Sequence, residues 1–155
     1  MAKNETEVAS DKRITLTITT PRGVKFVEKA DMVIMRGLEG DIGVLPGHES
    51  ISTVLGDGIL RIHNNGNVNK LAVFGGVAEI SDKTINILTT IAQSPDEIDL
   101  ERAESDRQEA EAALQERREE NISRRLQIMQ IRALVRINVS HSDYFSDDDS
   151  EDEES

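Results

Sequence analysis

The chain has 155 residues, of which 37% are apolar and 3% aromatic, and a formal net charge of −12, so it can supply one modest core but hardly two. The acidic balance and the few aromatic rings argue against nucleic-acid binding, which needs a basic surface and stacking side chains. The absence of cysteine excludes disulfides, thiolate catalysis and thiolate zinc sites, and neither the polar N-terminus nor any apolar run resembles a signal peptide or a membrane span.

Residues 1–13 lack apolar periodicity and are predicted to be a disordered arm. Residues 14–92 are predicted to form an all-β domain, because short apolar or alternating runs are separated by residues typical of turns. A series of this kind indicates an antiparallel sandwich or flattened barrel. The predicted strands are residues 14–19, 24–27, 32–35, 51–55, 59–63, 68–74, 77–81 and 84–89.

The turns between these strands are predicted from glycine and asparagine. Residues 64–67 (NNGN) contain the asparagine-glycine pair that is the strongest hairpin signal in the chain. Residues 56–58 (GDG) and 75–76 (GG) are also expected to reverse the chain. Residues 37–48 hold too many glycines for a helix, so we expect loop and short strand there.

The short strand-like runs give way to a segment rich in alanine, glutamate, glutamine and arginine, which indicates a helical domain over residues 93–139. Residues 94–97 (SPDE) match a capping box with proline at the first helical position, and Asp99 is a competing N-cap. The first helix is predicted to run to about Glu120. Its apolar positions are mostly alanine, so we expect it to pack closely but weakly.

A second helix is predicted from residue 122 to about Val139, after a reversal at Asn121. Its apolar residues form two stripes, and its charges are all arginines, at positions 124, 125, 132 and 136. Such a helix can pack against the glutamates of the first helix or be drawn to an acidic partner surface. Residues 140–155, with eight acids and no base from Asp143 on, are predicted to be a disordered acidic tail.

No catalytic or metal centre is predicted. The three histidines, His48, His63 and His141, are scattered and lack paired acids, so they suggest neither a metal cluster nor a hydrolytic centre. The glycine-rich loops lack the lysine that cradles a phosphate. We therefore expect no enzyme activity of the chain's own, no metal site and no required cofactor.

Three motifs, in this order, resemble the epsilon subunit of the F-type ATP synthase: residues 40–48 (GDIGVLPGH), 74–80 (FGGVAEI) and 98–103 (IDLERA). The resemblance spans about residues 14–139. It implies an α+β fold, with an N-terminal antiparallel β-sandwich of about ten short strands followed by a C-terminal antiparallel two-helix hairpin. It also implies a non-catalytic subunit of the central stalk, which binds the gamma subunit and the c-ring and couples rotation driven by protons or sodium ions to the catalytic head.

The resemblance implies partner contacts and a location as well. The loop at Asp41 matches the position that meets the c-ring, and His48 is nearby, although His48 is equally expected as a turn residue packed on the sandwich. In this family the helices move between a folded hairpin and an extended form that enters the alpha/beta catalytic head and blocks ATP hydrolysis. The chain would lie at the cytoplasmic face of the cell membrane as a peripheral part of the complex, without direct membrane insertion.

Some bacterial members of the family bind ATP, as a regulatory ligand, through a motif that residues 98–103 match in full. The resemblance implies that six residues surround the adenine and the phosphates. They are Ile98 and Asp99 at the adenine, Arg102, Arg132 and Arg136 at the phosphates, and Ala103, which leaves room. Guanidinium groups suit phosphate oxygens, so the assignment is chemically sensible.

Two positions depart from the ATP-binding pattern. Gln93 stands in place of a glutamate and can still accept a hydrogen bond at its carbonyl, whereas Glu109 stands in place of an arginine and should weaken binding. Asp99 and Arg102 are also what an ordinary first helical turn contains. Two alternatives therefore stay open: a structural stalk subunit whose helices do not move, and a free-standing ATP-sensing module.

Overall fold

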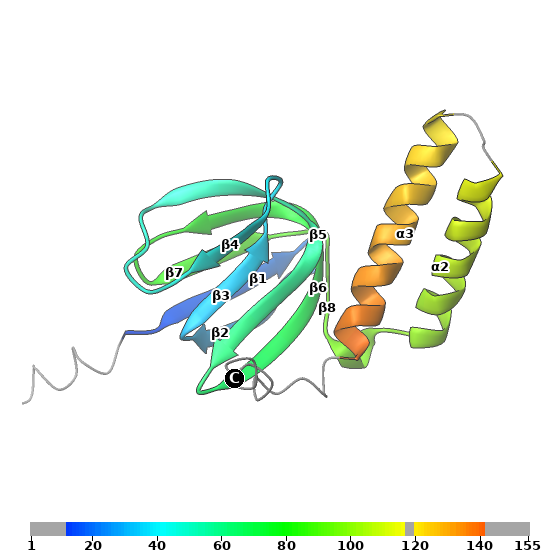
Figure 1. Cartoon of the computed structure of the whole chain (residues 1–155). Helices are drawn as coiled ribbons and strands as arrows, with labels where there is room; N and C mark the ends of the chain where they lie inside the picture. The colour runs from blue at the N-terminus through cyan, green and yellow to red at the C-terminus, as the bar shows by residue number, and fades with distance from the viewer. Residues whose placement is uncertain (1–11, 117–119, 142–155) are drawn as a thin grey trace, which may run out of the picture. The chain divides into compact units, whose positions relative to one another are not determined.

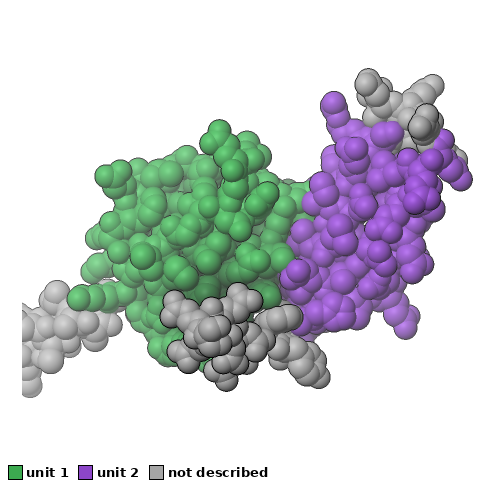
Figure 2. Space-filling model, in the orientation of Figure 1, with its two compact units in different colours: residues 1–92 green, residues 93–155 purple. Residues whose placement is uncertain are grey.

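The computed structural model of the chain describes residues 12–116 and 120–141. The chain forms two compact units, unit 1 (residues 1–92) and unit 2 (residues 93–155), which Figure 2 shows in green and purple. Unit 1 is built from strands and unit 2 from helices (Figure 1). The strands are β1 (Ile14–Thr20), β2 (Gly23–Ala30), β3 (Met32–Arg36), β4 (Asp41–Val44), β5 (Ile51–Asn64), β6 (Asn67–Ile80), β7 (Thr84–Leu88) and β8 (Ile91–Gln93), and the helices are η1 (Pro95–Glu97), α2 (Leu100–Gln115) and α3 (Glu120–Ser140).

The strands of unit 1 form one bent sheet in the order β2-β1-β7-β6-β5-β3-β4, with β8 paired to β6. Among β1 to β7, every neighbouring pair is antiparallel except β1 and β7, which run parallel. This pair corrects the expectation of a wholly antiparallel domain. No hairpin joins β1 to β7, so no local turn dictates their relative direction.

The two central strands, β5 and β6, are each 14 residues long and replace four of the predicted short strands. They are joined at Asn65 and Gly66, whose positive φ angles of 52° and 78° are those of the tight hairpin that an asparagine-glycine pair favours. The predicted hairpin is therefore confirmed. It places the two strands side by side along their whole length.

The predicted reversals at residues 56–58 and 75–76 are wrong, because these glycines bend the two long strands instead (Figure 1). Pairing continues through the bend, where Leu55 lies opposite Gly76. Gly76 has a φ of 121°, and a Cβ there would lie 2.3 Å from the carbonyl oxygen of Leu88, so only glycine fits. The bend folds the sheet back on itself, and the domain has eight strands rather than about ten.

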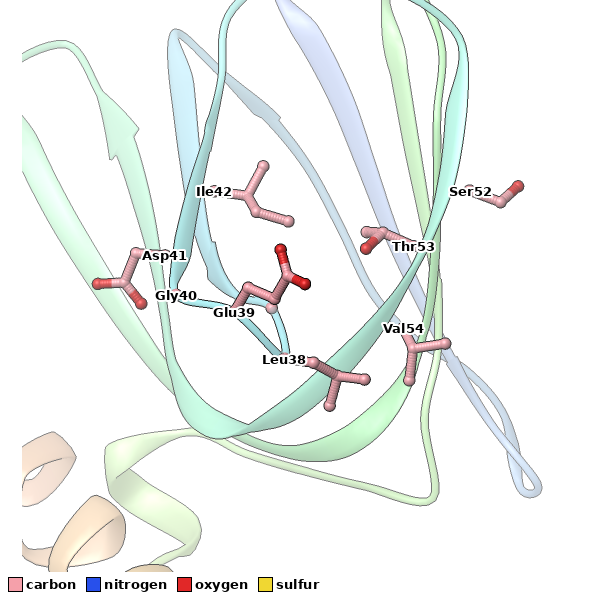
Figure 3. A pocket seen from close by; sticks show the side chains of 9 residues that line it. Leu38, Glu39, Gly40, Asp41, Ile42, Ser52, Thr53 and Val54 are labelled. Atoms are coloured by element: carbon pink, nitrogen blue, oxygen red, sulfur yellow. The ribbon is translucent and has the colours of Figure 1, made fainter.

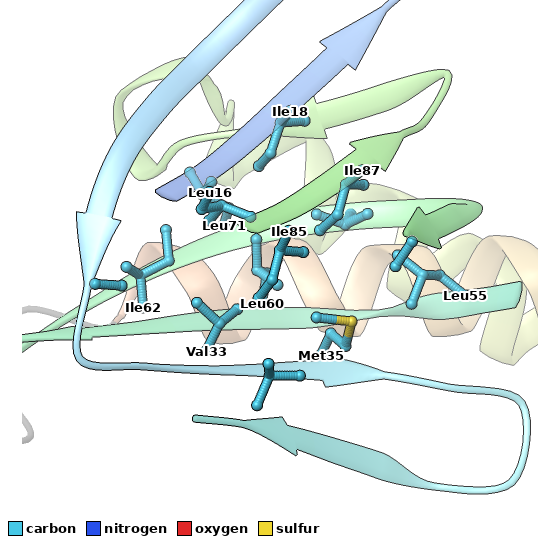
Figure 4. Close-up of a cluster of buried hydrophobic side chains, with 14 of the residues drawn as sticks. Leu16, Ile18, Val33, Met35, Leu55, Leu60, Ile62, Leu71, Ile85 and Ile87 are labelled. Carbon is cyan, nitrogen blue, oxygen red and sulfur yellow. The ribbon is translucent and has the colours of Figure 1, made fainter. Parts of the chain in front are cut away.

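Alternate residues along the strands point into a single core (Figure 4). On β1, Ile14, Leu16 and Ile18 are completely buried, as the predicted period of two requires. Complete burial of such a side chain contributes about 1.5–3 kcal/mol. The neighbouring strands add Val33, Met35, Leu60, Ile62, Ile85 and Ile87 to this core.

Unit 2 contains two antiparallel helices, α2 and α3 (Figure 1). The predicted boundary between them was shifted: α2 ends at Gln115, and Asn121, expected to reverse the chain, lies inside α3. The described helical residues at 0–1% exposure are Ala103, Ala110, Ala133 and Val139, and the small alanine side chains among them let two helices approach closely.

The predicted N-terminal arm and acidic tail fall almost entirely outside the described residues. α3 reaches Ser140, one residue beyond the predicted end of the helical domain. Within residues 12–116 and 120–141, no helix is both long and apolar enough to span a membrane.

Candidate functional site

The turn that precedes α2 is held by two successive caps. The Glu97 carboxylate accepts hydrogen bonds from the backbone N–H of Ser94 at 3.4 Å and from its hydroxyl at 2.9 Å. The Asp99 carboxylate then accepts a bond from the backbone N–H of Arg102 at 3.1 Å, which caps α2. The two competing caps in the sequence are therefore both used, one for each helical segment.

This turn and the start of α2 line a pocket of about 390 Å³ that lies within unit 2. Asp99, the N-cap of α2, and Arg102, Ala103 and Asp106 within the helix all line the pocket. Their spacing of three and four residues places them on one face of the helix. Ala103 is only 1% exposed, and its small side chain leaves the space above it open. The remaining lining residues are Gln93, Glu97, Ile98 and Arg136.

Arg136 is the contribution of α3 to this pocket. Its Nε donates a hydrogen bond of 2.9 Å to the side-chain carbonyl oxygen of Gln93. Because Gln93 is neutral, this bond orients the guanidinium group without cancelling its charge. Gln93, which departs from the ATP-binding pattern, therefore accepts a hydrogen bond at its carbonyl oxygen, and the donor is Arg136.

The structure brings most of the predicted nucleotide residues together. Those that line the pocket are Ile98, Asp99, Arg102, Ala103 and Arg136. Arg132 lies on α3 one helical turn before Arg136 and is not part of the lining. Glu109, expected beside the phosphates, is exposed on α2 and also lies outside the lining. The acid that does line the pocket is Asp106, which the sequence analysis missed although its spacing from Asp99 and Arg102 indicates a shared face.

The pocket combines groups that suit a nucleotide. The guanidinium groups of Arg102 and Arg136 can form paired hydrogen bonds with phosphate oxygens. The start of α2 adds the positive end of a helix dipole, and Ile98 adds an apolar surface for a ring.

A second pocket, of about 460 Å³, lies in unit 1 beside β4 and β5 (Figure 3). Asp41 lines it, and its carboxylate forms ion pairs with Arg36 at 3.4 Å and Arg61 at 3.9 Å. Two apolar lining residues, Leu38 and Val54, are 73% and 52% exposed. Exposed apolar side chains beside polar ones are typical of a surface that binds another protein.

An apolar row continues this surface across the sheet. Val54 on β5 pairs with Val77 on β6, which pairs with Leu88 on β7. All three side chains are exposed. The sequence analysis missed this row, because alternation along each strand does not show which outward-facing residues become neighbours.

His48 lies in the turn that follows β4, half-buried. Its backbone N–H donates to the carbonyl oxygen of Leu45 at 3.3 Å, and its Nδ1 lies 2.7 Å from the carbonyl oxygen of Glu49. His48 is not in the lining of the pocket that contains Asp41. The structure therefore does not bring the two predicted contact residues into one pocket.

Comparisons with known proteins agree on one family. Residues 13–95 match the family model described as ATP synthase, Delta/Epsilon chain, beta-sandwich domain. The ATP synthase epsilon chain of Desulfitobacterium hafniense is 34% identical over 128 residues, which cover 83% of this chain and 96% of that protein. The ATP synthase epsilon chain of Desulforamulus reducens is 38% identical over 122 residues, which cover 79% and 92%. A chain of the cryo-EM structure of Euglena gracilis mitochondrial ATP synthase with its c-ring superimposes with a TM-score of 0.68 and 29% identity, covering 77% of this chain and 76% of that one.

Proposed function

Since the chain belongs to the ATP synthase epsilon chain family, we propose that it is a non-catalytic rotor subunit in the central stalk of an F-type ATP synthase. It couples rotation of the c-ring, driven by protons or sodium ions, to the catalytic head. The observation that carries the proposal is the identity of 34% over 96% of the length of an ATP synthase epsilon chain. The subunit then lies at the cytoplasmic face of the cell membrane as a peripheral part of the complex.

Unit 1 supplies the stalk contacts in this proposal, with the gamma subunit and the c-ring as partners. The surface around Asp41 supports it, because ion pairs fix the carboxylate and the adjacent apolar row is exposed. His48 is a second proposed contact, in a separate turn.

Charge placed in the apolar row tests the stalk contact. Val77→Glu should lower co-purification with the gamma subunit by about tenfold or more, since it buries a charge in the interface. Val27→Glu is the matched control, because Val27 is also an exposed valine, at 61%, on a strand outside that row. Equal recovery of gamma with both variants would remove this surface from the proposal.

Unit 2 restrains ATP hydrolysis in this proposal, by exchanging its folded hairpin for an extended form that enters the alpha/beta catalytic head. The three alanines buried in unit 2, Ala103, Ala110 and Ala133, support it, because opening the hairpin exposes only a small apolar side chain at each of them. Ile128, Ile131 and Leu134 on α3 are 43–48% exposed, and a partner surface can cover them. Two states of similar free energy make a switch that a ligand can bias.

A truncated chain tests the inhibitory role. An assembled complex that carries residues 1–93 alone should hydrolyse ATP faster than the complex with the full chain. Unchanged hydrolysis would favour the alternative of a structural stalk subunit whose helices do not move. Co-purification of the truncated chain with gamma is the control that the complex has assembled.

ATP is the proposed regulatory ligand, bound in the pocket of unit 2. Ile98 and Asp99 lie at the adenine, Arg102 and Arg136 at the phosphates, and Ala103 leaves the space. Arg132 is a weaker candidate, because it lies outside the pocket lining; in the proposal it approaches the phosphates from the preceding turn of α3.

Calorimetric titration of ATP into the full chain tests this site. Arg102→Ala and Arg136→Ala should each lower the affinity by about tenfold or more, since each removes a charge-assisted bond. Arg125→Ala is the control, because Arg125 is exposed on α3 and lies outside the pocket lining. Equal heats in all four proteins would remove the nucleotide site.

The alternative of a free-standing ATP sensor keeps one observation in its favour: the described residues that line the pocket all belong to unit 2. Recovery of the gamma subunit with the tagged full chain separates the two roles. ATP binding without any recovered stalk subunit would favour the sensor.

A further inference from the structure

Asp106 is a side chain of the unit 2 pocket that has no part in the proposed nucleotide contacts. Asp106 lies on α2 one turn after Arg102, half-buried, and lines the pocket. Within the described parts of the chain, its carboxylate makes no hydrogen bond or ion pair. It is therefore available to act on whatever occupies the pocket.

The carboxylates of the pocket outnumber its guanidinium groups. The acids are Glu97, Asp99 and Asp106, and the cations are Arg102 and Arg136. Glu97 and Asp99 are hydrogen-bonded to N–H or O–H groups of their own turn, which spreads their charge over local donors. Asp106 has no such donor among the described residues.

A polyphosphate in this pocket would meet Asp106 as a like charge. Repulsion between like charges grows with the net charge of the ligand and is stronger in a partly enclosed site than in bulk water. A magnesium ion bound to the phosphates lowers that net charge and presents a cation that carboxylates attract. The same side chain thus disfavours the free nucleotide and tolerates its magnesium complex.

We propose that this pocket takes the magnesium complex of a nucleoside triphosphate in preference to the free nucleotide, and that Asp106 is the residue that sets this preference. The inference rests on the proposed nucleotide site. Arg102 and Arg136 provide the binding in either case, and Asp106 discriminates between the two ligands. It is a specificity-determining residue with no role in chemistry.

Titration calorimetry of the full chain with ATP, in excess Mg²⁺ and in excess EDTA, tests the preference. The wild type should bind ATP about tenfold more tightly with Mg²⁺ than with EDTA. Asp106→Asn should bind the free nucleotide more tightly than wild type does. The ratio of its affinity with Mg²⁺ to its affinity with EDTA should therefore fall to about twofold or less. Asp106→Glu retains the charge and should retain the preference.

Glu109→Gln is the matched control, because it removes the same charge three residues away from an exposed position outside the pocket lining. Its ratio of affinities with Mg²⁺ and with EDTA should equal that of the wild type.

An equal affinity ratio in wild type and Asp106→Asn, or no magnesium preference in the wild type, would overturn the inference while leaving the nucleotide site standing. No heat from either ligand with wild type and Asp106→Asn would overturn both. Far-UV circular dichroism of each variant verifies that the helices are formed.

Discussion

Asp99 has two separable roles at the scale of single residues. It caps α2 through the 3.1 Å bond from the backbone N–H of Arg102, and it lines the proposed nucleotide pocket. Asp99→Ala should therefore lower the stability of unit 2 by about 1 kcal/mol through loss of the cap and also weaken ATP binding. Urea unfolding followed by far-UV circular dichroism measures the first effect, and calorimetry measures the second.

Asp99→Ser separates these roles, because serine also caps helices but carries no carboxylate. We expect stability within about 0.5 kcal/mol of the wild type together with the weakened ATP binding of the alanine variant. Wild-type affinity in the serine variant would show that the carboxylate does not contact the ligand.

Asp31 predicts a pH-dependent contribution to the stability of unit 1. The backbone N–H of Asn65 donates to its carboxylate at 2.8 Å, and the Arg13 guanidinium donates at 3.1 Å; these bonds lower the pKa of Asp31 below its ordinary value of 3.8. A carboxyl group whose pKa is lower in the folded state stabilises that state above its ordinary pKa, and the contribution disappears as the pH falls through the folded pKa. Asp31→Asn should be less stable than wild type at neutral pH, and the difference should vanish in acid.

Urea unfolding of both proteins at a series of pH values measures this difference. Asp82→Asn is the control, because Asp82 is an exposed aspartate in another turn of the same unit. A difference between wild type and Asp31→Asn that stayed constant down to the lowest pH would contradict the prediction.

At the scale of secondary-structure elements, the size of the buried side chains limits how closely α2 and α3 pack. Ala110 is 0% exposed, so Ala110→Leu should overpack the hairpin and cost unit 2 about 1–3 kcal/mol. Urea unfolding followed by far-UV circular dichroism reports this loss. In the assembled complex, a looser hairpin should favour the proposed extended form and slow ATP hydrolysis.

Ala112→Leu is the matched control for this change, because Ala112 is on the exposed side of the same helix. It adds the same atoms without overpacking and should change stability by less than about 0.5 kcal/mol. Equal stability of the two variants would show that the alanine contact does not limit the approach of the helices.

The division into two units predicts how the whole molecule responds to ATP. A ligand bound at 100 times its dissociation constant stabilises the state that binds it by about 2.7 kcal/mol. Because the pocket lining, as far as the structure describes it, comes from unit 2, ATP should raise the melting temperature of the helical signal and leave that of the β-domain unchanged.

Thermal melts with and without ATP, followed at wavelengths that report helix and strand, measure the two units in one sample. Arg136→Ala should abolish the shift. A rise in both melting temperatures would mean that the ligand stabilises unit 1 as well, contrary to the pocket geometry.

Local patterns in the sequence were sufficient to predict that the first half of the chain forms strands and the second half forms helices. Alternation on β1 predicts the burial of Ile14, Leu16 and Ile18, and the asparagine-glycine pair predicts the hairpin at Asn65, because both depend on neighbouring residues. The caps at residues 94–99 were likewise readable as the start of helical structure. The family resemblance rests on motifs that are contiguous in the chain and is confirmed by the comparisons.

Contacts between distant segments were decided only by the tertiary structure. The glycines at residues 75–76 bend a strand rather than end it, because the neighbouring backbone at Leu88 sets the space around Gly76. The parallel pairing of β1 with β7 has no local cause either.

The same limit applies to the candidate site. The sequence by itself determined that Asp99, Arg102 and Ala103 share the first turns of a helix, because three- and four-residue spacing fixes a helix face. Only the folded hairpin decided that Arg136 rather than Arg132 reaches the pocket, that Gln93 holds it, and that Asp106 rather than Glu109 is the acid inside. The physical reason is that helix geometry is a property of neighbouring residues, whereas a pocket depends on how separate elements pack.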